Sequence, residues 1–315
     1  MPSSVARSFA DPDYYATAIR QGTSEVTQTA RGHFTAHLTR IDLHKLWMQR
    51  FSETVARVKH TTGWGGRAVI AFPTRPGLRQ SWSGVDLQST EIIRLSEGSS
   101  YYQHSAGATS YGTMSLPVAD MTSLGASIAG RDLSPPCDAL IVTPLPSAMA
   151  KLQRLHAAAG HLAETAPEVI ANPEAARGLE QALIEAMVGC MAIDDAREDR
   201  ASQRRHERIM RRFHKLIEEQ PDQPFYIPEI CTAIGIAERT LRLCCQEQLG
   251  MSPKQFLITR RMHMVRRELS RALPGTTKVT DVAAHYGFWE FGRFAAVYKS
   301  LYGELPSATL KRAPA

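Results

Sequence analysis

One short segment, which recurs once, constrains the fold of this chain more than any other feature. It is Ile230–Pro253, with the sequence ICTAIGIAERTLRLCCQEQLGMSP. A short helical pattern ends at Gly235, a tight turn follows, and a second helical pattern runs from Glu238 to about Leu249. Glycine suits that turn because it adopts a positive φ without steric penalty. The segment therefore predicts two short helices joined by a tight turn, which is a helix-turn-helix.

The same pattern recurs further along the chain. The corresponding residues are Cys231 and Ala283, Gly235 and Gly287, Leu241 and Phe294, Gly250 and Gly303, and Pro253 and Pro306. The first two pairs are 52 residues apart and the last three are 53 apart, so one residue is inserted at the start of the second recognition helix. Two copies of this motif predict two helices that enter DNA grooves.

The net charge of +6 is unevenly distributed along the chain. Residues 201–315 hold 19 Lys and Arg against 11 Asp and Glu, whereas residues 1–200 hold 18 against 20. A basic region on a near-neutral remainder indicates a nucleic-acid-binding module attached to a different kind of domain. We therefore expect one domain at residues 1–195, a charged linker at residues 196–207, and a DNA-binding domain at residues 208–315.

The amino-terminal domain is expected to be an antiparallel β-barrel or sandwich. Residues 1–32 are polar, and we expect them to pack poorly, with a short helix near Tyr14–Ile19. Short runs separated by Gly and Pro then predict strands at Phe34–Leu43, Glu53–Lys59, Arg67–Phe72, Leu78–Ser83, Thr90–Leu95, Gly112–Leu116 and Ala139–Thr143. With the helices that follow, the predicted fold class is α+β, ending in an all-α domain with two helix-turn-helix units.

Residues 148–193 predict a helical hairpin, interrupted at Pro167 and restarted at Asn172-Pro173. Its apolar stripe consists of Leu152, Leu155, Ala159, Leu162, Leu179, Leu183, Ala186, Met187, Cys190 and Met191. The stripe can pack on the β-domain or on a second copy of the chain. We favour the second copy, which predicts a homodimer.

Residues opposite the core stripe of a recognition helix meet the major groove. In the first helix the candidate DNA-binding residues are Glu238, Arg239, Thr240, Arg242, Leu243 and Gln246. Arg binds guanine with two hydrogen bonds, Gln binds adenine, and Leu contacts a thymine methyl group. The alternative, that these are ordinary solvated side chains, is weakest for the two arginines because the motif is duplicated and the region is basic.

The second helix is chemically different. With Phe294, Val297, Tyr298 and Leu301 expected to face inward, its candidate DNA-binding residues are Glu290, Phe291, Arg293, Ala296 and Lys299. Arg293 and Lys299 suit phosphates, which orient a protein without specifying sequence. Phe291 either contacts a thymine methyl group or packs against Trp289, and we favour packing. We infer that the first helix specifies most of the sequence and that the second mainly clamps DNA.

Residues 208–312 resemble the DNA-binding domain of the AraC/XylS family of bacterial transcription regulators. The resemblance is carried by Ile230-Cys231, Gly235-Ile236, Arg239-Thr240-Leu241, Leu249-Gly250, Ser252-Pro253, Arg260-Arg261, Val282-Ala283, Gly287-Phe288, Phe294, Tyr298-Lys299, Tyr302-Gly303 and Pro306-Ser307. It implies seven helices, with a long helix joining two units that enter successive major grooves. It also implies base contacts at Arg239, Arg242, Leu243, Phe291, Gly292, Ala295 and Ala296.

Three positions depart from the family pattern. Ala237 stands where Ser is usual, so the first recognition helix lacks its N-cap or takes one from another group. Cys244-Cys245 replace larger residues, and Trp289 to Gly292 replace small polar residues before Arg293. The last departure weakens direct base contact by the second unit.

The amino-terminal part resembles the cupin-like sensor domain of such regulators. The resemblance rests on Thr90 to Ile93, Glu97 to Ser100 and Ser115 to Pro117. It implies a small-molecule effector and a helical dimer contact after the barrel. We expect double-stranded promoter DNA and RNA polymerase as partners; an activator is expected, but the sequence does not give the sign of regulation.

Other classes of protein find less support in the sequence. A barrel enzyme would need a metal or catalytic group, but His33 and His37 on a strand would lie roughly 13 Å apart at about 3.3 Å per residue. We therefore expect no enzyme activity, no metal and no cofactor.

The five cysteines are expected to be buried and to act as small hydrophobic residues. Without an apolar run or a secretory signal, we expect a cytoplasmic protein with no membrane partner. A third alternative is a structural protein that binds DNA regardless of sequence.

Overall fold

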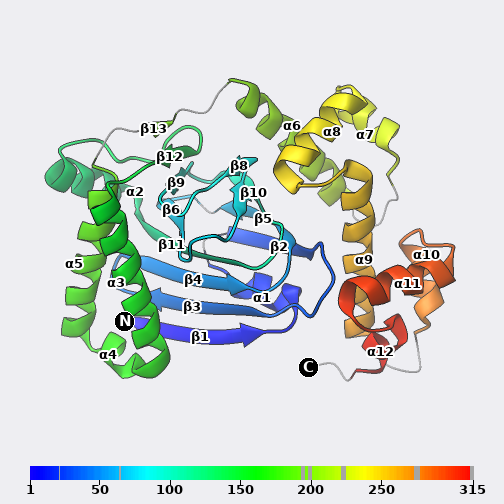
Figure 1. Ribbon diagram of the computed structural model, residues 1–315, viewed down its shortest axis with the longest axis horizontal. Helices are drawn as coiled ribbons and strands as arrows, with labels where there is room; N and C mark the ends of the chain where they lie inside the picture. Colours follow the sequence, from blue (N-terminus) through cyan, green and yellow to red (C-terminus); the bar gives the residue numbers. More distant parts are fainter. Residues whose placement is uncertain are drawn as a thin grey trace.

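Two antiparallel sheets form the amino-terminal part of the protein in the computed structural model (Figure 1). The structure describes residues 1–20, 22–63, 65–192, 196–197, 201–220, 225–272 and 277–312, and the side chains of all of these except 196–197 and 201–204. The larger sheet has the order β1 (Ser3–Phe9), β3 (Ala36–Asp42), β4 (Trp47–Glu53), β11 (Thr109–Pro117), β6 (Arg67–Pro73), β9 (Ile92–Leu95), β12 (Leu140–Val142) and β13 (Ala196–Arg197). The smaller sheet has the order β2 (Gly22–Gln28), β5 (Arg57–Gly63), β10 (Ser100–Ser105), β7 (Gln80–Trp82) and β8 (Val85–Asp86).

The two sheets form a sandwich and not a closed barrel. Within the described residues the larger sheet ends at β1 and β13, and the smaller sheet ends at β2 and β8. Aromatic and aliphatic side chains of both sheets, among them Leu38, Phe51, Trp82 and Tyr111, fill the space between them. The predicted antiparallel fold is therefore confirmed in its sandwich form.

Residues 1–32 are better ordered and more deeply packed than the sequence predicts. They form β1, α1 (Pro12–Ala18) and β2, and the Asp11 carboxylate caps α1 by accepting from the backbone N–H of Asp13 at 2.8 Å. Tyr15 is fully buried, and its hydroxyl donates to Glu53 at 2.5 Å. The prediction was wrong because polar residues dominate this segment while one aromatic ring anchors it. The predicted strand Glu53–Lys59 is also misplaced, since residues 54–56 form the turn between β4 and β5.

The helical hairpin covers the outer face of the larger sheet (Figure 1). It comprises α3 (Pro146–Thr165), α4 (Pro167–Ala171) and α5 (Pro173–Cys190), preceded by α2 (Val118–Leu124) and the π-helical turn η1 (Gly125–Ala129). Leu152, Leu183 and Met187 are fully buried, in one cluster with Ile70 and Met114 of the sheet. The favoured placement of this stripe against a second copy is therefore wrong, because the chain buries it internally.

The carboxy-terminal region is helical and lies against the outer face of the smaller sheet (Figure 1). It contains α6 (Ala201–Glu219), α7 (Ile227–Ile234), α8 (Glu238–Leu249), α9 (Pro253–Arg271), α10 (Val279–His285), α11 (Phe291–Tyr302) and α12 (Pro306–Lys311). Residues 201–207 of the expected linker begin α6, whereas residues 198–200 lie outside the described residues. The domain limits at 195 and 208 stay a prediction. Among the described helices, none is long and apolar enough to cross a membrane.

Charged residues are buried inside the sandwich. Arg57 donates to Glu53 at 2.6 Å, and the Lys59 ammonium group donates to the Tyr111 hydroxyl. All four side chains are nearly inaccessible to solvent. Burial lowers the pKa of Lys59 to about 7, Glu53 opposes this shift, and the positive charge of Arg57 adds to it.

The depressed pKa of Lys59 predicts a pH-dependent stability. Above pH 7 the folded state releases this proton, whereas the unfolded chain retains it up to its usual pKa of 10.5. The free energy of unfolding should therefore rise with pH between 7 and 9, by up to about 1.4 kcal/mol per unit. In Lys59→Met, the free energy of unfolding measured in urea should no longer show this rise between pH 7 and pH 9. Lys151→Met, at an exposed position on α3, should keep it, and equal pH slopes for all three proteins would refute the assignment.

Candidate nucleic-acid interface

Positive-φ glycines end the helices that build each helix-turn-helix. Gly235 has φ 69° and Gly287 has φ 78° at the two turns, while Gly250 and Gly303 end α8 and α11 at 70° and 76°. A side chain at any of the four would be strained. The duplication seen in the sequence is thus a duplication of backbone geometry.

The back of α8 is anchored in a hydrophobic core. Leu241, Cys245 and Leu249 are fully buried, as their spacing predicts, and they pack with Phe213 of α6 and Phe256 of α9. This anchoring fixes which face of α8 points outward.

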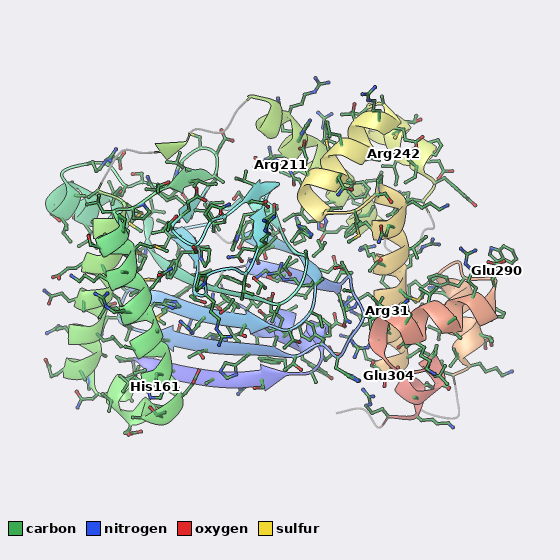
Figure 2. All side chains as sticks on the ribbon, in the orientation of Figure 1. Arg31, His161, Arg211, Arg242, Glu290 and Glu304 are labelled. Atoms are coloured by element: carbon green, nitrogen blue, oxygen red, sulfur yellow. The ribbon has the colours of Figure 1, made fainter. Side chains whose placement is uncertain are left out.

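The six predicted residues of α8 lie together on one surface groove. The groove has a volume of about 790 Å³ and is lined by Ile227, Glu238, Arg239, Thr240, Arg242, Leu243, Gln246, Ser252, Pro253 and Lys254. All six are exposed except Thr240, which is half-buried. Figure 2 shows Arg242 pointing outward from α8, away from the sandwich. Two arginines, a lysine, an amide and an exposed leucine can together meet base edges and phosphates.

The Arg242 guanidinium is paired within its own helix. It donates to Glu238 at 2.6 Å, and both side chains are exposed, at 68% and 45%. An exposed pair of this kind contributes at most about 1 kcal/mol, so a guanine can displace the carboxylate. Glu238 therefore orients Arg242 along the helix without immobilising it.

The amino terminus of α8 has no side-chain cap. Ala237 makes no capping hydrogen bond, whereas the Ser252 hydroxyl caps α9 by accepting from the backbone N–H of Gln255 at 3.2 Å. The predicted loss of the first cap is thus seen directly. The uncapped N–H groups and the positive end of the helix dipole suit a phosphate.

The outer face of α11 presents the predicted residues of the second unit. Glu290, Phe291, Arg293, Ala296 and Lys299 are all exposed, and Arg293 donates to Glu290 at 3.3 Å. Figure 2 shows Glu290 at the outer end of this unit.

Two details of the second unit differ from the sequence predictions. Trp289 is 79% exposed and Phe291 is 41% exposed, and no ring contact joins them in the described part of the chain. The favoured packing of Phe291 on Trp289 is therefore wrong. Val297, expected to face inward, is 40% exposed and lines a groove with Ile258 of α9. Trp289 was missed as a candidate, although a tryptophan beside the turn glycine is the signal that could have found it.

The cysteines are buried with one exception. Cys190, Cys231, Cys244 and Cys245 are buried, as predicted, whereas Cys137 is exposed, contrary to the prediction. Burial raises the pKa of Cys190 to about 12 and that of Cys244 to about 11. Thiols with such pKa values stay protonated and unreactive at neutral pH.

The sandwich contacts the DNA-binding region on the side opposite the groove. A β-carbon on Gly250 would lie 2.2 Å from Nε2 of His104, so a side chain there would have to displace this ring, and it would also be strained at a φ of 70°. On α9, Arg267 donates to Asp13 at 3.0 Å, and His263 lies 3.2 Å from the same carboxylate. Burial alone would raise the pKa of Asp13, but hydrogen bonds from His263 and Arg267 hold it well below its usual range.

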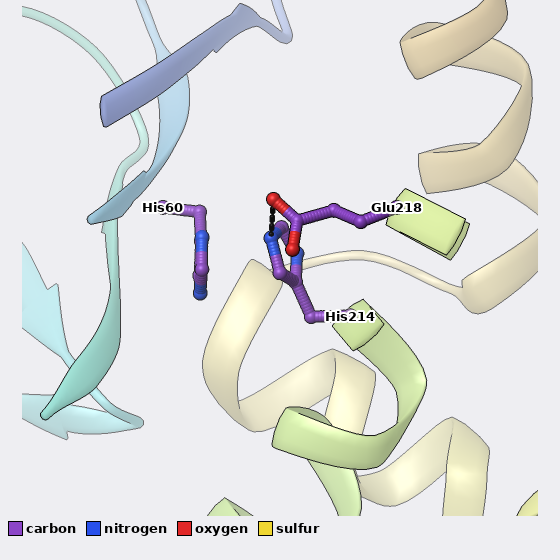
Figure 3. A group of neighbouring side chains, drawn as sticks. All are labelled: His60, His214 and Glu218. Atoms are coloured by element: carbon purple, nitrogen blue, oxygen red, sulfur yellow. Dashed lines mark ion pairs between the residues drawn. The ribbon is translucent and has the colours of Figure 1, made fainter. Parts of the chain in front are cut away.

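One group of side chains between the two regions combines metal-binding donors. His60 of β5 meets His214 and Glu218 of α6, with their nearest ligand atoms all within 4.8 Å of one another (Figure 3). The sequence predicted no metal, and its only candidate ligands were His33 and His37. It missed this group because its members lie far apart in the chain.

Comparison with known proteins identifies the carboxy-terminal part. Residues 230–312 match a family model described as a helix-turn-helix domain. The chain is 34% identical over 106 residues to the "Probable thc operon regulatory protein" of Rhodococcus erythropolis, covering 34% of this chain and 32% of that protein. It is 33% identical over 101 residues to the "XylDLEGF operon transcriptional activator 3" of Pseudomonas putida, covering 32% and 30%.

A crystal structure of a "probable AraC family transcriptional regulator" from Rhodopseudomonas palustris is 33% identical, covering 34% of this chain and 99% of that one, with a TM-score of 0.31. The matches span about a third of the length of the first two relatives. They fall on the duplicated helix-turn-helix region, where the sequence resemblance also lies. Through this region, the chain belongs to the AraC/XylS family of transcription regulators.

Proposed function

We propose that this protein is a sequence-specific transcription regulator that binds promoter DNA through two helix-turn-helix units in successive major grooves. The observation that carries the proposal is the groove on α8, where Arg239, Arg242 and Gln246 share one exposed surface. The opposite side of α8 packs on the hydrophobic core, so the helix holds these side chains in fixed positions. As a DNA-binding regulator with bacterial relatives, the protein would act in the cytoplasm on the nucleoid, without catalytic activity of its own.

Replacing Arg239 and Arg242 by Ala tests the assignment of base contacts. Each lost bidentate contact should weaken binding to a promoter site by about 1–3 kcal/mol, with a smaller effect on random DNA. A promoter fragment recovered by genome-wide binding-site mapping provides the probe, and fluorescence anisotropy at fixed salt provides the affinity. Arg154→Ala, on the exposed side of α3, is the matched control.

Two outcomes would contradict this part of the proposal. Unchanged promoter affinity in the double variant would remove the two arginines from the interface. Equal affinity of the wild-type protein for promoter and random DNA would indicate a structural protein that binds regardless of sequence.

The second unit is proposed to clamp DNA and contribute little sequence discrimination. Arg293→Ala and Lys299→Ala should each lower the affinities for promoter and random DNA by the same factor, because phosphate contacts carry no sequence information. Each lost phosphate contact should also reduce the slope of log affinity against log salt by about 0.9. Lys151→Ala should leave that slope unchanged. A selective loss of promoter affinity in Arg293→Ala would instead assign base contacts to the second unit.

The sandwich is proposed to bind a small polar effector at buried polar groups of its smaller sheet. Several buried polar atoms there have no hydrogen-bond partner within the described residues, namely Arg57 Nη2, Gln80 Nε2, Trp82 Nε1, Gln103 Oε1 and Ser105 Oγ. Buried polar atoms in native proteins are usually paired, so an oxygen-bearing ligand or water suits them. A screen of metabolites by thermal unfolding of the full chain tests this, and the absence of any stabilising polar compound would count against it.

We also propose that the protein works as a homodimer that activates transcription by contacting RNA polymerase. The apolar stripe of the hairpin is buried internally, so the available dimer surface is the exposed side of α5, around Arg177, Gln181 and Glu185. Sedimentation velocity measures the oligomeric state, and run-off transcription measures activation. A monomer at all concentrations would contradict the homodimer. Repression in the transcription assay would contradict activation.

A further inference from the structure

The interface between the sandwich and the DNA-binding region contains a group with the donor set of a transition-metal site. His60 comes from β5, and His214 and Glu218 stand one helical turn apart on α6 (Figure 3). The His214 Nε2 atom lies 2.9 Å from a Glu218 oxygen, and the two imidazole rings have their centroids 3.3 Å apart. We propose that these three side chains bind a divalent transition-metal ion of the zinc class.

The distances suit such an ion once the two imidazole rings, which lie against each other with their planes 31° apart, turn so that one nitrogen of each faces the same point. Zinc binds imidazole nitrogen and carboxylate oxygen at about 2.0–2.2 Å, so donors around a tetrahedral ion lie roughly 3.3 Å apart. The three ligand atoms already lie within 4.8 Å of one another. Two imidazoles and one carboxylate leave a further position for water, and nitrogen-rich ligand sets favour zinc, copper, nickel and cobalt over magnesium and calcium.

A neighbouring side chain orients the central ligand. The Tyr102 hydroxyl is hydrogen bonded to Nδ1 of His214 at 2.7 Å. When Nδ1 carries the proton and donates to Tyr102, the lone pair of Nε2 is free to bind a metal. That Nε2 atom is buried and lies 2.9 Å from a Glu218 oxygen, with which it forms an ion pair when the ring is protonated. A metal ion can take the place of that proton, because Nε2 faces both a carboxylate and a second imidazole.

The donor set suits a divalent cation, because Glu218 supplies a carboxylate and the two imidazoles bind metal in their neutral form. Glu25, paired with His60 across β2 and β5, lies 3.6 Å from Arg260 and is thereby neutralised.

The ligands come from both regions, so a bound ion would hold α6 against β5. Because α6 packs on α8, metal binding would then restrict the orientation of the candidate DNA-binding groove. This regulatory consequence rests on the proposed function, whereas the metal site itself does not. Glu218 is 54% exposed and gives the ion a route from solvent.

The test uses the full-length protein, treated with chelator and then titrated with Co²⁺ as a spectroscopic probe and with Zn²⁺ by calorimetry. We expect one ion per chain and visible d–d absorption typical of a four- or five-coordinate ion. His60→Gln and His214→Gln should weaken binding at least about tenfold, the loss that even an outer-shell partner can cause. His206→Gln, at a histidine paired with Glu247 elsewhere in the helical region, should bind as the wild type does.

Glu218→Gln keeps the test decisive if the buried histidine variants fail to fold, because its side chain is largely exposed. It should fold normally, bind Co²⁺ more weakly, and show a smaller Zn²⁺-induced rise in melting temperature than the wild type. Binding of less than one ion per chain, or unchanged affinity in Glu218→Gln and His214→Gln, would reduce the group to interface packing. Metal binding is measured without DNA, so its failure is distinct from failure of the regulator proposal. Promoter affinity with and without Zn²⁺ then tests the regulatory consequence.

Discussion

The smaller sheet is buried on both faces, and the arrangement of the whole protein depends on this constraint. Successive residues of a strand point to opposite faces. In β5, Arg57 and Lys59 therefore enter the sandwich, while Val58 and His60 meet the helical region. A shift of one residue would place two cations against α6 and two apolar or aromatic groups among charges, so the register is strongly specified. One five-stranded sheet thus contributes side chains to the core of the sandwich and to the core of the helical region.

Because the smaller sheet is buried on both faces, it connects the sandwich to the DNA-binding face through direct side-chain contacts. Tyr102 of β10 shares a hydrophobic cluster with Leu241 and Cys245, the residues that anchor the back of α8. The opposite side of α8 carries the groove with Arg239 and Arg242. A ligand that changed the twist or position of the smaller sheet would act on α8 through side chains in direct contact. Coupling of this kind would require two arrangements of the contact between sheet and helix, with each site favouring one of them.

The sequence specified the helical region better than the sandwich, for a physical reason. Gly235 and Leu241 sit in a local pattern whose meaning depends on neighbours a few residues away. Tyr15 anchors the amino-terminal segment through Glu53, and that contact cannot be seen in a local window. The same holds for His60 and His214, which only the packing of α6 on β5 brings together. The outward position of Trp289 is a different case, because hydrophobicity alone predicts burial and the chain has instead left the ring exposed.

The charge of the helical region acquires a different meaning once its partners are known. The excess of basic residues after residue 200 indicated a nucleic-acid-binding module. On α9, however, Arg260 approaches Glu25 and Arg267 binds Asp13, so these cations hold the sandwich. Both acidic partners belong to the amino-terminal segment that was predicted from its composition to pack poorly. The cations that remain for DNA are those on the groove side, led by Arg239 and Arg242. Sequence specificity and domain docking therefore draw on separate sets of basic residues within one positively charged region, and weakening one set need not weaken the other.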